Sequence, residues 1–174
     1  ELSALFNGSD LASKIVELRP SEAFRRGYEI ECDEGEDSAE DIKAAATKLR
    51  VNEQALNAWI WGRLYGGCLL VAGLDDGQTP DKPLKEENIK SVRYFNTIDR
   101  RYVFPHSYYT DPLSAKFGEV EKWQITGDNQ DTVTAIVHET RCLSFEGPRV
   151  DRKTRRQLNG WTFSTPQRLY DTMR

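Results

Sequence analysis

The chain has 174 residues, of which 38% are hydrophobic and 30% are charged, a balance typical of a globular region that can bury a core of its own. No stretch approaches the roughly 18 consecutive apolar residues of a membrane-spanning helix, so we expect no contact with a membrane. The net charge of −4 excludes a general electrostatic attraction to nucleic acid.

Residues 1–67 are predicted to be mostly helical. Apolar residues at helical spacing from Leu2 to Leu18 indicate a helix with Ser9 or Asp10 as a cap, and Pro20 is expected to end it. A half-buried strand, 28–32, should follow. The acidic turn 33–37 could hold a metal, but exposed carboxylates in a row are more typical of a solvated loop. We therefore predict no metal ligands.

A long helix is predicted next, and it leads into a central strand. Ser38 opens the helix with a capping box, and the apolar stripe runs to Leu64, although residues 51–52 could divide it. Gly66 and Gly67 should end it, because glycine reaches the left-handed conformation of helix caps. The apolar run 68–72 then predicts a strand that is buried on both faces.

Residues 68–147 are predicted to be rich in β-structure. Strands are expected at 92–95, 103–104, 119–125, 132–137 and 143–145. The turn 99–102 should lead into the second of these, and Gly127-Asp128-Asn129 is the best hairpin signal in the chain.

Residues 148–164 are predicted to form a basic loop. Five basic residues are opposed there only by Asp151, and they are Arg149, Arg152, Lys153, Arg155 and Arg156. Such a run could contact phosphate, so a small nucleic-acid-binding module remains an alternative function. A solvated loop, or a contact with acidic residues of a neighbouring subunit, fits an acidic chain better. Ser164 and Pro166 predict a new helix over 165–174.

The sequence contains one candidate for a catalytic site. His138-Glu139-Thr140 fits one half of a two-histidine phosphodiesterase, in which one histidine acts as acid and the other as base. The other histidine, in His106-Ser107-Tyr108, lacks the threonine or serine that the second half requires. We predict no catalytic residue and no cofactor, and we keep the phosphodiesterase as an alternative.

The three cysteines and the first residue add two expectations. Cys32, Cys68 and Cys142 are scattered without metal-ligand spacing, so we expect reduced, buried thiols. The chain begins at Glu1, and its only methionine is Met173. We therefore expect the single region 1–174 to be a fragment of a longer protein, with a truncated helix at 165–174.

The order of these segments resembles the portal proteins of tailed bacteriophages and prophages, in the phage-associated group formerly described only as a domain of unknown function. Five stretches carry the resemblance: LASKIVE (11–17) with RRGY (25–28); AWIWGRLYGG (58–67); LDDG (74–77); YFN (94–96) with DR (99–100); and HETRCLSFEG (138–147) leading to GW (160–161) and Ser164. Together they span nearly the whole chain in the expected order.

The resemblance implies an α+β fold, the N-terminal wing region, with long helices packed on a mixed β-sheet and a following stem that 165–174 would approach. It implies a structural subunit, not an enzyme, in a ring of typically twelve copies at one capsid vertex. Double-stranded DNA would pass through this ring without sequence-specific contact. The implied partners are other copies of the chain, the major capsid protein, the terminase and a head-tail adaptor. The implied location is the virion, after assembly in the host cytoplasm.

Eight residues are predicted to matter for structure or assembly. Tyr65, Gly66, Gly67, Arg100 and Trp161 stand at the predicted helix end and turns. The other three are the arginines of the basic run, Arg152, Arg155 and Arg156. We hypothesise that this run pairs with the acidic turn 33–37 of a neighbouring subunit, because ring closure joins two different patches.

Overall fold

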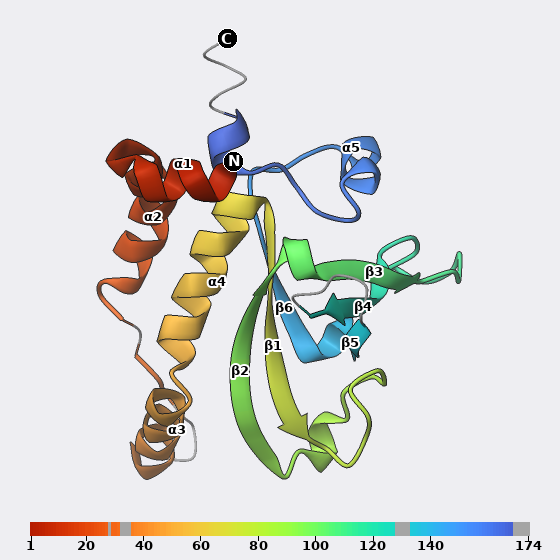
Figure 1. Cartoon of the computed structure of the whole chain (residues 1–174). Coiled ribbons are helices and arrows are strands. Elements are labelled where there is room, and N and C mark those ends of the chain that lie inside the picture. Colours follow the sequence, from red (N-terminus) through yellow and green to blue (C-terminus); the bar gives the residue numbers. More distant parts are fainter. Residues whose placement is uncertain (28, 32–35, 128–132, 169–174) are drawn as a thin grey trace.

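The computed structural model describes residues 1–27, 29–31, 36–127 and 133–168, and it shows helices packed beside two small sheets (Figure 1). The helices are α1 (Leu2–Gly8), α2 (Asp10–Phe24), α3 (Glu36–Lys48), α4 (Val51–Tyr65) and α5 (Arg152–Gln157). The strands are β1 (Gly67–Asp75), β2 (Ser91–Asp99), β3 (Val103–Tyr108), β4 (Val120–Thr126), β5 (Val133–His138) and β6 (Cys142–Glu146). The predicted α+β class is confirmed.

The strands form two antiparallel sheets instead of the one mixed sheet that was expected. One sheet has the order β2-β1-β6 and the other β3-β4-β5. Two short 3-10 turns, η2 (Arg100–Tyr102) and η3 (Glu139–Arg141), carry the chain from one sheet to the other. The side chain that precedes each turn caps it, because Asp99 accepts from the N–H of Arg101 and His138 from that of Thr140.

The first half of β1 is the centre of the fold and is buried on both faces, as predicted. Cys68 and Leu70 face α4, where they form a cluster with Ala58. Leu69 and Val71 face the second sheet and pack in the main core with residues of β3, β4 and β5 and with Trp161. The alternation of side chains along a strand therefore joins the helical layer to the second sheet through β1.

Several predicted boundaries shift. Ser9 divides the first helical segment and caps α2 by accepting from Ala12 N–H. The long helix is divided at Arg50, whose φ of 53° is left-handed, just before the predicted place. Residues 29–31 form no strand, so that prediction is wrong for them, while 28 and 32 lie outside the described residues.

Other predictions concern the second half of the chain. The antiparallel pairing of β4 with β5 confirms the hairpin, although most of its turn lies outside the described residues. Part of the expected basic loop is the helix α5, because the Asp151 side chain accepts from the N–H groups of Lys153 and Thr154 and starts a turn. The C-terminal helix begins at 165 as predicted, with Ser164 Oγ accepting from Gln167 N–H at 3.0 Å.

Pro20 does not end α2, and Arg63 of α4 supplies the reason. A proline has no N–H, so Val16 O loses its normal helical donor at position 20. Arg63 Nε donates to Val16 O at 2.9 Å, and Arg63 Nη2 donates to Ile15 O at 2.8 Å. Val16 is fully buried, so this carbonyl would otherwise have no access to water. The helix thus continues through Pro20 because another helix satisfies the acceptor.

Replacing Arg63 with methionine is expected to cost about 1–3 kcal/mol of stability, because Val16 O then stays buried without a donor. In a Pro20→Ala background the alanine N–H can bond to Val16 O, so the same replacement should cost clearly less. Thermal unfolding of the four proteins in this double-mutant cycle measures the coupling. Equal costs in the two backgrounds would contradict the assigned role of Arg63.

Candidate functional site

Five of the predicted residues meet beside the end of α4, together with Thr162, which was not predicted. We call this place the Gly66 junction, and its residues are Tyr65, Gly66, Gly67, Arg100, Trp161 and Thr162. Gly66 ends α4 with a φ of 85°, and its N–H donates to Gly62 O at 2.9 Å. Its carbonyl accepts from Thr162 N at 3.1 Å and from Thr162 Oγ1 at 2.8 Å. A Cβ on Gly66 would lie only 2.2 Å from Thr162 O. Glycine is therefore required for both conformation and space.

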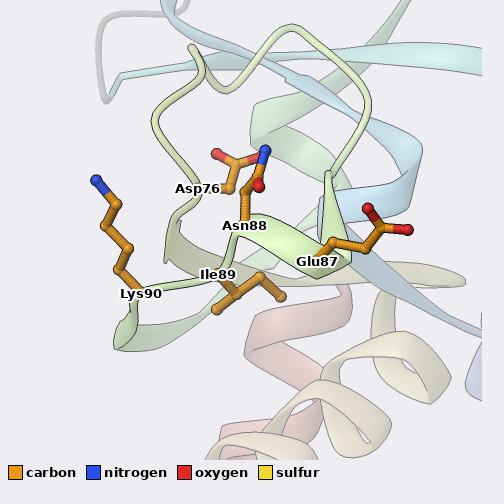
Figure 2. Close-up of a pocket in the computed structure, with 5 residues that line it drawn as sticks. All are labelled: Asp76, Glu87, Asn88, Ile89 and Lys90. Carbon is orange, nitrogen blue, oxygen red and sulfur yellow. The ribbon is translucent and has the colours of Figure 1, made fainter.

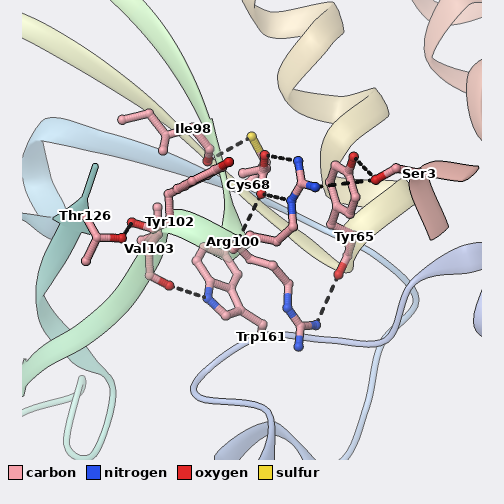
Figure 3. Close-up of polar contacts among 11 residues, drawn as sticks. Ser3, Tyr65, Cys68, Ile98, Arg100, Tyr102, Val103, Thr126 and Trp161 are labelled. Carbon is pink, nitrogen blue, oxygen red and sulfur yellow. Dashed lines mark hydrogen bonds and ion pairs between the residues drawn. The ribbon is translucent and has the colours of Figure 1, made fainter. Parts of the chain in front are cut away.

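Arg100 holds the same two segments together. Its Nη1 donates to Tyr65 O at 3.1 Å (Figure 3). The same nitrogen donates to Thr162 O at 2.8 Å. The carbonyl of Tyr65 lies at the end of α4, where the helix dipole attracts a cation and carbonyls lack helical donors. Burial lowers the pKa of Arg100 from its ordinary value, but a guanidinium stays charged. Arg100 thus links the helix end to the segment that follows α5.

Trp161 packs against Gly67 between the two sheets. It is 1% exposed, and its ring stacks on Trp123 with centroids 4.6 Å apart. Its indole N–H donates to Val103 O at 3.4 Å (Figure 3). A Cβ on Gly67 would lie 2.2 Å from a ring carbon of Trp161. The absence of a side chain at Gly67 lets the indole lie on the backbone of β1.

The side chain of Tyr65 connects this junction to α1. Its hydroxyl lies 3.0 Å from Ser3 Oγ, and the guanidinium of Arg101 lies 4.1 Å from the centre of its ring. Arg101 is itself paired with Asp99 at 2.8 Å. Ser164 follows the junction and is 1% exposed, so the helix that begins at 165 starts from a rigid base beside the end of α4 (Figure 1).

The three predicted arginines of α5 do not belong to the Gly66 junction, and they differ from one another in their contacts. Arg155 forms an ion pair with Glu146 and donates through Nε to Gly160 O at 2.9 Å. Arg152 and Arg156 form no ion pair within the described residues. Both lie against Gly118, since a Cβ there would be 3.0 Å from Arg152 Nη2 and 3.8 Å from Arg156 Nη2. Residues of the acidic turn 33–37 are partly outside the described ranges, so their pairing stays a hypothesis.

The two histidines do not form a shared site. His138 ends β5, His106 lies in β3, and β4 runs between these strands. His138 is 2% exposed, burial lowers its pKa, and its Nδ1 accepts from Thr140 N–H at 3.3 Å. The Thr140 hydroxyl accepts from Leu84 N–H at 2.9 Å. The backbone N–H of His138 donates to Pro80 O at 2.9 Å, so His138 and Thr140 both hold the loop between β1 and β2.

A buried ion pair that was not predicted from the sequence lies at the other end of β1. Asp76 Oδ2 lies 2.6 Å from Arg141 Nη2, and their side chains are 0% and 3% exposed. Asp76 also accepts from the N–H groups of Gln78 and Lys85, both at 3.2 Å. Arg141 Nε donates to Lys82 O at 2.8 Å. Asp76 lies in LDDG and Arg141 lies in HETRCLSFEG, two of the stretches that carry the family resemblance. Their place in these stretches was the one signal in the sequence that pointed to the two residues.

This ion pair lies beside a shallow hollow lined by Asp76, Glu87, Asn88, Ile89 and Lys90 (Figure 2). The bond from Arg141 is the main reason that the pKa of Asp76 lies well below its usual range, with the two backbone N–H groups adding to the effect. Both carboxylate oxygens already have donors. Asp76 therefore offers no carboxylate oxygen without a donor to a ligand in the hollow.

The described residues hold no further kind of site among those considered next. They contain no group of three potential metal ligands, and none of their helices is long and apolar enough to cross a bilayer. Cys68 and Cys142 are free thiols, and burial raises the pKa of Cys142 to about 12. Cys32 lies outside the described residues.

Comparison with known proteins identifies the family. An anti-CBASS protein, Acb1, from Caulobacter sp. (strain RHG1) is 26% identical to this chain over 179 aligned residues. The match covers the whole of this chain but only 28% of that relative. The family described as phage portal protein matches residues 1–174, which is the entire chain. The chain therefore belongs to the phage portal protein family.

Proposed function

We propose that this chain is the wing region of a portal subunit, a structural component of a ring at the capsid vertex through which double-stranded DNA enters and leaves. The observation that carries this proposal is the family match over residues 1–174. The ring would serve genome packaging and head-tail connection. The chain would have no catalytic activity of its own, and the separation of His106 from His138 by β4 agrees with this.

The Gly66 junction suits this role mechanically. It ties α1, α4, β1 and the segment 161–164 into one unit, and the helix that starts at 165 leaves from it. In a portal subunit that helix would approach the stem. A side chain added at Gly66 or Gly67 would collide with backbone or with a buried ring, so the junction is tightly packed. We infer that it transmits force between the wing and the stem without changing shape.

The proposed partners are further copies of the chain, the major capsid protein, the terminase and a head-tail adaptor. A ring of about a dozen copies follows the pattern of the family, and the location would be the virion after assembly in the host cytoplasm. The net charge of −4 favours passage of DNA without tight binding, since the 28 acidic residues outnumber the 24 basic residues that could hold its phosphates.

The mass of the full-length gene product in solution tests this proposal. We expect a closed ring of about a dozen subunits by light scattering and electron microscopy. A product that stays monomeric at high concentration would refute the ring. Salt-dependent DNA binding without a ring would favour the nucleic-acid-binding module, and nucleotide turnover that His138→Ala abolishes would favour the phosphodiesterase.

Reversing two charges on α5, with Arg152→Glu and Arg156→Glu, is expected to weaken ring assembly at least about tenfold, because these cations have no partner within the described part of the chain. Arg155 is left unchanged, since its pairing with Glu146 serves the fold. The matched control is Lys85→Glu with Lys90→Glu, which changes the net charge equally at two exposed residues of the β1–β2 loop. Native gel electrophoresis or mass photometry over a range of concentrations measures assembly. Equal effects of the two double variants would contradict a specific contact.

A further inference from the structure

The end of β5 and the turn η3 hold the loop between β1 and β2 in place. The N–H of His138 donates to Pro80 O at 2.9 Å. Two residues later, the hydroxyl of Thr140 accepts from Leu84 N–H at 2.9 Å. Both attachments come from one short segment, so the conformation of η3 decides whether this part of the loop is bound.

The imidazole of His138 caps η3 in one particular protonation state. Its Nδ1 accepts from Thr140 N–H at 3.3 Å, and Thr140 Oγ1 lies 3.0 Å from the same nitrogen. Because Oγ1 already accepts from Leu84 N–H, its own proton is available for donation to Nδ1. Nδ1 therefore carries no proton, and the ring is the neutral tautomer with its proton on Nε2.

A second proton would change these bonds, because Nδ1 is the ring nitrogen that can still accept one. The imidazolium would present an N–H to the N–H of Thr140, and the cap of η3 would be lost. The hydroxyl proton of Thr140 would lose its acceptor as well. Since this hydroxyl also binds Leu84, the attachment of the loop depends on the charge of His138.

The surroundings of His138 oppose a charged ring. The side chain is 2% exposed, and burial is the main reason that its pKa lies below the ordinary value. Lys122 of β4 and Lys116 of the β3–β4 loop lower this pKa further, while Glu139 of η3 and Glu121 of β4 raise it. The two carboxylates do not outweigh burial, so the folded protein favours neutral His138.

The nearby carboxylates already have other partners. Glu139 is paired with Lys116 at 2.5 Å, and Glu121 accepts from Ser107 Oγ at 3.0 Å. On the β1–β2 loop, Asp81 accepts from the side chain of Thr79, and the charges of Lys122 and Lys82 act on it. None of these carboxylates has a printed bond to the imidazole, so a proton on the ring would gain no direct ion pair in this arrangement.

The buried ion pair of Asp76 and Arg141 holds the same loop but responds to a different pH range. The pKa of Asp76 is lowered, so the pair persists at the pH where a histidine titrates. Asp76 also keeps its bond from Lys85 N–H. Protonation of His138 would therefore loosen the part of the loop around Leu84 and leave the loop attached at Asp76.

We propose that His138 and η3 form a pH-sensitive clamp on the β1–β2 loop. Neutral His138 caps η3, and the turn holds the loop at Pro80 and Leu84. A proton from solvent that binds His138 Nδ1 breaks the cap and releases this part of the loop. The clamp belongs to the folded subunit and does not depend on the proposed ring.

Hydrogen exchange of the full-length gene product between pH 7 and pH 5 tests the clamp. Residue 83 is a proline without an N–H, so overlapping peptides that differ by residues 83–84 isolate the amide of Leu84. Its exchange rate, divided by the intrinsic rate at each pH, gives the opening equilibrium. Opening should increase about tenfold for each pH unit below the ordinary histidine pKa of about 6.5, because the open form binds one more proton. The increase should level off at the lowered pKa of the closed form.

Two replacements of His138 form a matched pair. In His138→Asn the side-chain oxygen can take the place of Nδ1 as an acceptor but does not titrate. The amide of Leu84 should therefore stay protected from pH 7 to pH 5. In His138→Gln the amide group lies one carbon further out, so the cap is lost and opening should be high at both pH values. His106→Asn is the control and should keep the wild-type increase, because β4 separates β3 from β5.

The possible outcomes decide the proposal. Opening of wild type that stays constant from pH 7 to pH 5 would overturn the clamp. An increase that persists in His138→Asn would also overturn it, because another group would then be the one that titrates. If His138→Asn does not fold, His106→Asn still tests the assignment, since loss of the increase in that variant would assign the titration to His106.

Discussion

Replacing Gly66 with alanine is expected to destabilise the protein by at least about 4 kcal/mol, more than most single substitutions do. Alanine at a φ of 85° is strained, and its Cβ would lie 2.2 Å from the carbonyl oxygen of Thr162. Because that neighbour is backbone, the segment 161–164 must move. The movement would break the bonds that Thr162 makes with Gly66 and Arg100.

Gly77→Ala is the matched control for this substitution. Gly77 also has a positive φ, 74°, but nothing lies within 4 Å of an added Cβ. Its replacement should therefore cost only the conformational strain, about 1–2 kcal/mol. Chemical unfolding of both variants gives the two values. Similar losses at the two glycines would mean that the close approach of Thr162 does not constrain the junction.

Replacing Arg141 with methionine should lower the melting temperature by roughly 10 °C, because it leaves the carboxylate of Asp76 buried without its cation. It also removes the bond from Arg141 Nε to Lys82 O, so the loop between β1 and β2 should loosen from η3. Differential scanning calorimetry measures the shift, and hydrogen exchange at residues 78–90 reports the loosened loop.

The double variant Asp76→Asn with Arg141→Met is the control. It removes both charges, so it should be more stable than Arg141→Met alone even though it carries one more substitution. If the double variant were the less stable of the two, the buried charge would not be the source of the loss.

The same ion pair predicts a pH dependence. The pKa of Asp76 is lowered in the folded protein, chiefly by the bond from Arg141, while the unfolded chain titrates near the ordinary value of about 3.9. The unfolded state therefore binds more protons in this range, and stability falls as the pH falls. The stabilisation that the ionised Asp76 contributes is complete above the unfolded-state pKa of about 4. It is lost as the pH falls from there towards the lowered pKa of the folded state. The gap in melting temperature between wild type and Asp76→Asn should be constant from pH 7 to pH 5 and should shrink below pH 4; a gap that stayed constant to pH 2.5 would contradict this assignment.

Much of the local structure was predictable because it depends on residues close together in the chain. Gly66 and Gly67 marked the end of α4, and the apolar run after them marked β1, since helix caps and buried strands carry local signatures. Tyr65, Arg100 and Trp161 were selected as structurally important, and the structure brings them together. Their contacts could not be foreseen, because 35 and 62 residues separate Arg100 from its two acceptors.

The sequence by itself determined the α+β class, the main helices and strands and the segments that resemble portal proteins, because periodicity and turn residues act locally. Only the tertiary structure decided that Pro20 stays within a helix, since the donor for Val16 O comes from Arg63 on α4. It also decided that the strands divide into two antiparallel sheets and that Asp76 meets Arg141. These outcomes depend on which distant groups are buried together, and no local pattern encodes the cost of leaving a buried carbonyl or charge without its partner.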